Sequence, residues 1–201
     1  MKRNRLVLVL LALGCSLTAF GQGIKLTPFG GYTIQDRVYG YYGDMVIKDG
    51  VHYGLNLTYE KSSNLGIDLL YSHQATQFQV YDYSLGVGNK TGNIDGSVSY
   101  LMLGSRHSPD FNAKLSPYGG VLLGAAIFNS KATSETWKFA VGARLGAVYH
   151  INDKFGIMIQ TQLMIPVQGI GIYFGTGGGG ASTSSTATQL GFTGGIEVKI
   201  R

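Results

Sequence analysis

The chain has 201 residues, of which 16 are Lys or Arg and 11 are Asp or Glu. Charged residues make up 13% of it, roughly half of the share that is usual in soluble domains, while it contains 31 Gly and 13 Tyr. The length suits one domain, and the lack of a basic cluster beyond the first residues excludes a polyanion-binding surface, so no nucleic acid is expected as a partner.

The first residues have the three-part pattern of a secretory signal peptide. Three basic residues precede an apolar run at residues 6–14, and small residues stand three and one positions before a cut at Gln22. We therefore expect a signal peptide at residues 1–21 and a mature domain at residues 22–201. Because the apolar run is shorter than the about 20 residues that a membrane helix needs, a helical anchor is not expected.

Removal of this leader changes the charge and the cysteine content. The mature chain keeps 13 basic and 11 acidic residues, a net charge of +2. The "LALGC" sequence that ends at Cys15 has an imperfect match to a lipoprotein signal, so lipidation at Cys15 is the alternative to its removal. With Cys15 removed the mature domain has no cysteine, and burial and hydrogen bonding alone must stabilise it.

Eight segments of the mature chain alternate large apolar residues with small or polar ones. The clearest is "WKFAVGARLGAVY", in which Trp137, Phe139 and Leu145 share one parity and Lys138 and Arg144 the other. A period of two predicts extended strands, and no segment has the apolar spacing of an amphipathic helix. The predicted strands span residues 24–34, 51–60, 65–72, 96–104, 115–127, 137–149, 154–167 and 189–200. The fourth is the least regular, because Leu101 and Leu103 share its otherwise small face.

The connections between these segments differ in length. Residues 61–64 and 151–153 make short turns and residues 106–113 a modest one, whereas three other links have about 15 to 20 residues. Short turns at one end and longer loops at the other are expected for antiparallel strands, with both chain termini at the short-turn end. Residues 175–189 are rich in Gly, Ser and Thr and predict a flexible loop with little structure of its own.

The smaller face of the strands has too few charges for a surface in water. It would suit the interior of a narrow barrel, where short side chains and isolated, paired charges fit. The other face offers nine to eleven residues of apolar alternation, as a tilted transmembrane strand requires. Aromatic residues near the strand ends would form a girdle at the lipid headgroups: Tyr32, Tyr53, Tyr59, Tyr71, Trp137 and Tyr149. The larger face is therefore predicted to contact lipid, with a soluble lipocalin-like barrel as the alternative.

Strands in hydrocarbon must pair all their backbone N–H and C=O groups, which requires a closed sheet. The expected fold is thus all-β, an eight-stranded antiparallel up-and-down transmembrane β-barrel after a cleaved signal peptide. Together with "KFAVGARLGAVYHINDKFGI" (residues 138–157), this plan resembles the OmpA/OmpX-type small outer-membrane β-barrels, described as an outer membrane protein beta-barrel domain. The resemblance implies a location in the outer membrane of a Gram-negative bacterium.

Several short motifs resemble catalytic or ligand-binding sites. "GTGGGG" (residues 175–180) has GxGxxG spacing but no following helix, which is typical of a loop and not of a phosphate cradle. "RHSPD" (residues 106–110) places His, Ser and Asp in one turn, where side chains point in different directions. The histidines fall on separate segments: His52, His73, His107 and His150. No catalytic, cofactor or metal site is therefore predicted.

Four charged residues of the smaller face, Glu60, Asp68, Arg144 and Glu197, are the candidate site residues. They are predicted to form a polar core that plugs the lumen and sets the strand register. The alternative is a selectivity ring of a small pore, which the narrow width of eight strands disfavours.

The long loops contain Tyr with Asp and Lys, a mixture that suits protein or glycan contact. The same segments equally suit β-extensions that pack against each other beyond the membrane. The leading hypothesis is a non-enzymatic outer-membrane barrel with a structural or surface-binding role, whose partners are membrane lipid and an extracellular ligand. The alternatives are a small pore or transport component, and an enzyme that acts on lipid.

Overall fold

The computed structural model describes nine stretches of the chain. They are residues 23–38, 43–82, 89–90, 93–111, 113–130, 133–167, 170–175, 178–183 and 187–200. The predicted signal peptide and Cys15 lie outside them. Among the residues so described, no helix is long and apolar enough to cross a membrane.

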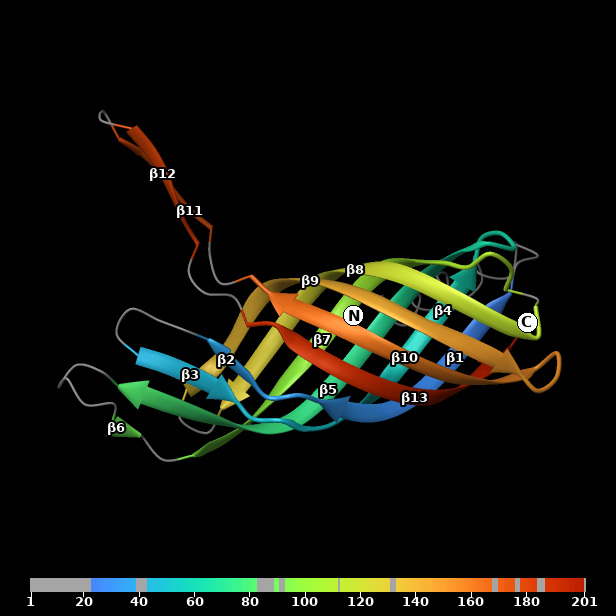
Figure 1. Ribbon diagram of the computed structural model, residues 1–201, viewed down its shortest axis with the longest axis horizontal. Coiled ribbons are helices and arrows are strands. Elements are labelled where there is room, and N and C mark those ends of the chain that lie inside the picture. Colours follow the sequence, from blue (N-terminus) through green and yellow to red (C-terminus); the bar gives the residue numbers. More distant parts are fainter. Residues whose placement is uncertain are drawn as a thin grey trace, which may run out of the picture.

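Eight long strands close into a barrel (Figure 1). They are β1 (Ile24–Thr33), β4 (Gly50–Glu60), β5 (Leu65–Asp82), β7 (Ile94–His107), β8 (Leu115–Ser130), β9 (Thr133–His150), β10 (Phe155–Pro166) and β13 (Gln189–Lys199). Each pairs antiparallel with the next, and β13 closes the sheet against β1, with Gly195 opposite Phe29. Closure satisfies the backbone groups of both would-be edges, and it confirms the predicted fold class.

The alternation of side chains separates an apolar outer surface from the lumen. On β9, Trp137 and Leu145 are 59% and 65% exposed, whereas Ala140, Arg144 and Val148 are buried inside. All eight barrel strands carry large exposed apolar side chains of this kind. A continuous outward apolar band on a closed barrel is the lipid-facing surface of a transmembrane protein. The predicted orientation of the two faces is therefore confirmed.

The lumen differs from the expectation of short side chains. Leu101 and Leu103 of β7 point outward, while Tyr100 and Met102 of the same strand are buried inside. Other large lumen residues are Phe29, Leu70, Val98, Tyr118, Leu122, Met158 and Met164. Glycines opposite them provide the space: a Cβ on Gly104 would lie 2.6 Å from Leu122 Cδ2. Large and small residues thus interdigitate, which the alternation within one strand does not reveal.

The strands extend well past the length that a membrane requires. β5 and β9 have 18 residues each, against the nine to eleven of a transmembrane strand. The first long link contains β2 (Asp36–Val38) and β3 (Gly43–Ile47), and β6 (Asn89–Lys90) pairs with the end of β5. β3 pairs with β5, placing Ile47 opposite Phe78. The described parts of the first two long loops thus form β-extensions, as one interpretation of the sequence expected.

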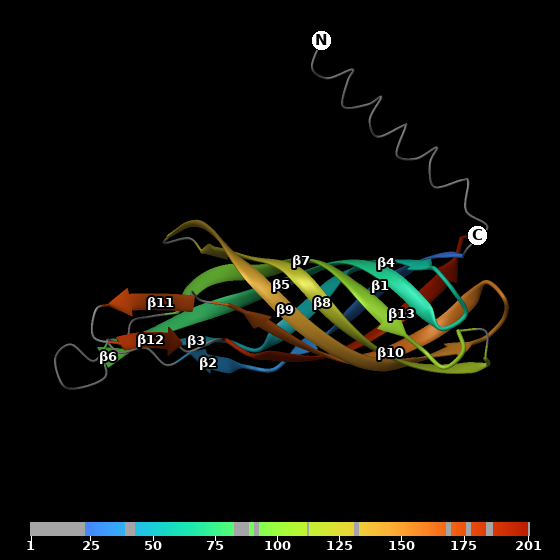
Figure 2. The same ribbon diagram turned by 90° about the horizontal axis from the view of Figure 1, so that it is seen from above.

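The Gly-rich segment also departs from its prediction as an unstructured loop. β11 (Ile170–Gly175) and β12 (Gly178–Thr183) pair antiparallel along their whole length. The β10–β13 ladder holds the two ends of this segment side by side, so a sequence of low strand propensity finds a partner. Figure 2 shows this hairpin, β2, β3 and β6 at the end of the barrel opposite the C-terminus.

Candidate functional site in the barrel lumen

A buried ion network lies near the short-turn end of the lumen. Lys25 Nζ on β1 lies 2.7 Å from Glu60 Oε1 and 2.9 Å from Glu197 Oε1. Arg106 Nη2 on β7 lies 2.9 Å from Glu197 Oε2. Two cations and two carboxylates from four strands therefore neutralise each other, and of the four only Glu60 is partly exposed.

An aromatic side chain covers this network. Phe111, in the turn between β7 and β8, is buried, and its ring centroid lies 5.3 Å from Arg106 Cζ and 5.6 Å from Lys25 Nζ. Two hydrogen bonds attach the turn to the neighbouring β4–β5 turn, since the Phe111 and Ser108 N–H groups donate to the carbonyls of Ser63 and Asn64. The turn therefore places the Phe111 ring against Arg106 and Lys25 at the short-turn end of the barrel, where it makes cation–π contacts.

A second ion pair lies farther into the lumen. Arg144 on β9 pairs with Asp68 on β5, and both are buried. Asp68 Oδ1 also accepts hydrogen bonds from Asn56 Nδ2, at 3.0 Å, and from the Thr58 hydroxyl. These donors satisfy Oδ1 of a carboxylate that is fully buried, while Arg144 faces Oδ2.

Hydrogen-bonded polar residues fill the next layers. Tyr118 donates to Gln160 Oε1 at 2.8 Å, and Tyr100 donates to Gln189 Oε1 at 2.6 Å. His52 lies between two hydroxyls, with Nδ1 2.9 Å from Thr33 and Nε2 3.0 Å from Thr193. The cavity beside His52 and Tyr100 has a volume of about 10 Å³, about the space of one water molecule.

The four candidate residues from the sequence fall into two groups. Arg144 forms an ion pair with Asp68. Glu60 and Glu197 both form ion pairs with Lys25. Lys25 was not among the predicted site residues, and the prediction that Arg106 lies in a turn is wrong because β7 continues through His107. Extending the inward parity of β7 from Met102 to Arg106, and that of β1 from Thr27 to Lys25, would have found both cations.

The other singled-out residues do not gather in one cluster, although His150 Nε2 lies 3.5 Å from Glu197 Oε1. Ser108 is fully buried and His107 exposed, so the "RHSPD" side chains face different ways. His73 contacts Ser99, whereas the His150 Nδ1–H donates to the Ala113 carbonyl. Within the described stretches, no three His, Cys, Asp or Glu residues are grouped as metal ligands would be.

Solved structures share this architecture. Neisserial surface protein A aligns with a TM-score of 0.60 over 88% of this chain and 97% of that chain, at 11% identity. The fold is that of the small outer-membrane β-barrels. OprG of Pseudomonas aeruginosa (TM-score 0.55, 14% identity, 90% and 97% coverage) and AlkL, studied in lipid bilayers (0.56, 15%, 91% and 92%), have it too. No family model and no curated protein matches the chain. The predicted OmpA/OmpX-like architecture is confirmed at the level of the small outer-membrane barrel fold.

Proposed function

We propose that the chain is a non-enzymatic, closed outer-membrane barrel that anchors a folded extracellular β-structure for surface binding. The observation that carries this proposal is the filled lumen. Ion pairs, hydrogen-bonded polar residues and large apolar side chains occupy successive layers of the lumen. These layers extend from Phe111 at the short-turn end toward the end that carries the β-extensions.

The energetics of the lumen support closure. A conducting path needs a continuous column of water, yet Asp68 and Arg106 are no more than 1% exposed. Moving Arg144 away from Asp68 would leave a buried charge without its partner, which costs about 3–5 kcal/mol. Eight strands enclose an interior just wide enough for side chains, so the network acts as a plug.

The outer extension supports the binding role. Beyond the membrane-spanning length, the apolar core of the barrel continues into the extension, with Val46, Ile47 and Phe78 buried and the rings of Phe78 and Phe128 6.4 Å apart. Because strands that pack around such a core hold their shape, the extension offers a fixed surface, on which binding costs less ordering entropy than on a mobile loop. Its partner would be an extracellular protein or glycan, and the barrel wall would contact membrane lipid.

Planar-bilayer recording tests the closed lumen. The purified barrel should insert without single-channel steps in concentrated KCl, while a general porin added to the same bilayer supplies the positive control. Clear steps from the barrel itself would favour the small-pore alternative and overturn the plug.

A binding screen tests the surface role. Cells that display the full chain are compared with cells whose β8–β9 hairpin is shortened between Phe128 and Phe139, on an array of extracellular proteins and glycans. A ligand retained by the full chain and lost on shortening supports the proposal. Equal binding by both, or binding by neither, would overturn the surface-binding role and leave a purely structural barrel.

A further inference from the structure

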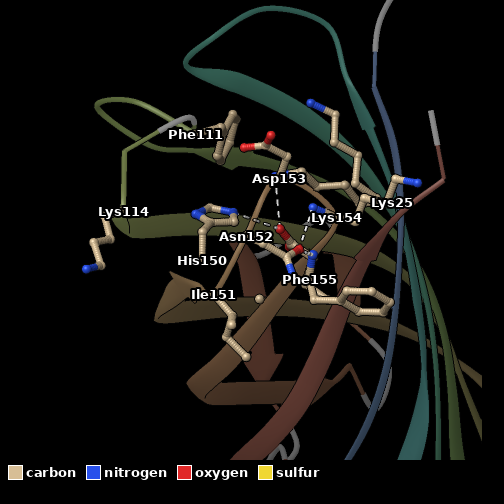
Figure 3. Close-up of a pocket in the computed structure, with 12 residues that line it drawn as sticks. Lys25, Phe111, Lys114, His150, Ile151, Asn152, Asp153, Lys154 and Phe155 are labelled. Carbon is tan, nitrogen blue, oxygen red and sulfur yellow. Dashed lines mark hydrogen bonds and ion pairs between the residues drawn. The ribbon is translucent and has the colours of Figure 1, made fainter.

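The short-turn end of the barrel contains a cavity of about 410 Å³ that the lumen network does not fill (Figure 3). Its polar lining is strongly basic: Lys25, Lys114, Lys154, Lys199 and His150, with the acidic residues Asp153 and Glu197. Glu60 and Glu197 neutralise Lys25. Lys114, Lys154 and Lys199 have no ion-pair partner among the described residues.

The backbone brings two of these lysines together. The Lys199 N–H donates to the Lys154 carbonyl at 2.8 Å, which ties the end of β13 to the β9–β10 turn. Asn152 Oδ1 in turn accepts from the N–H groups of Lys154 and Phe155, both at 2.9 Å, and so fixes the shape of that turn. The ammonium groups therefore extend from a held scaffold and not from a free loop.

The same cavity has apolar residues on the outer side of the barrel. Ile151 and Phe155 line it and are 60% and 46% exposed. Lys114 Nζ lies 5.7 Å from the ring centroid of Tyr149, a residue of the lipid-facing band. In Figure 3, Lys114 and Phe155 lie to either side of His150 and Asn152. A lysine over an aromatic ring at the edge of an apolar band sits at the depth of the lipid headgroups.

We infer that this cavity binds an anionic phospholipid of the inner leaflet, the leaflet that meets the short turns of such barrels. Lys114, Lys154 and Lys199 would contact the phosphate of the negatively charged lipid headgroup. Ile151 and Phe155 would contact the first acyl carbons. A soluble anion would use the lysines but not the apolar rim, so the mixed lining points to a lipid. This inference does not depend on the proposed anchoring function or on whether the lumen conducts.

Native mass spectrometry of the folded barrel in a mild detergent with added dioleoylphosphatidylglycerol tests it. The wild-type barrel should retain one phosphatidylglycerol, and the triple variant K114Q/K154Q/K199Q should bind it at least about ten-fold more weakly, since each lysine near a membrane surface contributes to anionic-lipid binding. The variant K114R/K154R/K199R keeps the charges and should restore binding.

The matched control K48Q/K61Q/K138Q removes the same charge from lysines outside the cavity and should bind within about two-fold of the wild type. Heat-modifiable gel migration first verifies that each variant is folded. Three results would each overturn the inference: equal binding by the triple variant and the wild type, equal retention of zwitterionic dioleoylphosphatidylcholine, or displacement of the lipid by inorganic phosphate, which indicates a soluble-anion site.

Discussion

Arg144 on β9 and Asp68 on β5 form a buried ion pair across the lumen, between strands that are not neighbours in the sheet. Their contact links opposite walls of the barrel directly, which backbone pairing alone does not do. Asn56 and Thr58, on the neighbouring strand β4, donate hydrogen bonds to the same carboxylate. Such a pair specifies register, because a slip of one residue would turn either side chain toward lipid.

Breaking this pair should strongly destabilise the barrel. We expect Asp68→Ala to lower the free energy of unfolding by about 3–5 kcal/mol, because Arg144 is then buried without a counter-charge. The double variant D68A/R144M, which removes both charges, should recover most of that loss. Urea unfolding in lipid vesicles, followed by the fluorescence of Trp137, the single tryptophan, gives both values. A loss below about 0.5 kcal/mol in D68A would contradict a stabilising role for the pair.

The outward apolar band predicts that the energetic cost of an introduced charge depends strongly on where the charge is placed. Leu145→Arg places a cation on the lipid-facing side of β9, where Leu145 is 65% exposed, and should cost about 2–4 kcal/mol. Ser62→Arg in the exposed β4–β5 turn is the matched control and should change the stability by less than about 0.5 kcal/mol. The same vesicle assay measures both variants. Equal effects at the two positions would mean that the band does not face hydrocarbon.

Close packing makes Gly104 difficult to replace, whereas Gly194, on the exposed side of β13, has room for a side chain. A Cβ on Gly104 would lie 2.2 Å from the Val121 carbonyl oxygen, whereas one on Gly194 meets nothing closer than 3.9 Å. Gly104→Ala should therefore destabilise by about 1–3 kcal/mol, and Gly194→Ala should be nearly neutral. Thermal loss of the compact gel form ranks the two variants. A ranking in the opposite order would contradict the described packing.

The contribution of Phe111 to the stability of the barrel should depend on both the volume and the aromatic ring of its side chain. Phe111→Ala removes the whole buried side chain and should cost about 3–5 kcal/mol. Phe111→Leu keeps most of the volume but loses the cation–π contacts to Arg106 and Lys25, so its cost should be clearly smaller but measurable. Urea midpoints compare the two. A leucine variant as stable as the wild type would show that the aromatic contact contributes nothing.

The architecture of the barrel follows from the sequence alone. Alternation along β9, with Trp137 and Leu145 on one parity and Arg144 on the other, assigned the strand and its lipid-facing side, since a period of two is a property of one strand. The number of such segments, and the need to pair every backbone group in hydrocarbon, then led to a closed barrel of eight strands.

The pairing of the lumen charges, in contrast, could not be derived before the folded barrel was known. Arg144 forms an ion pair with Asp68 and not with Glu197, which pairs with Lys25 and Arg106. These contacts depend on the relative shift of the strands around the closed barrel. The inward placement of Tyr100 and Met102 required glycines on other strands, and the β11–β12 hairpin required neighbours that hold its ends. Each of these outcomes arises from residues distant in the chain, whereas hydrophobic alternation reports only the side to which each residue points.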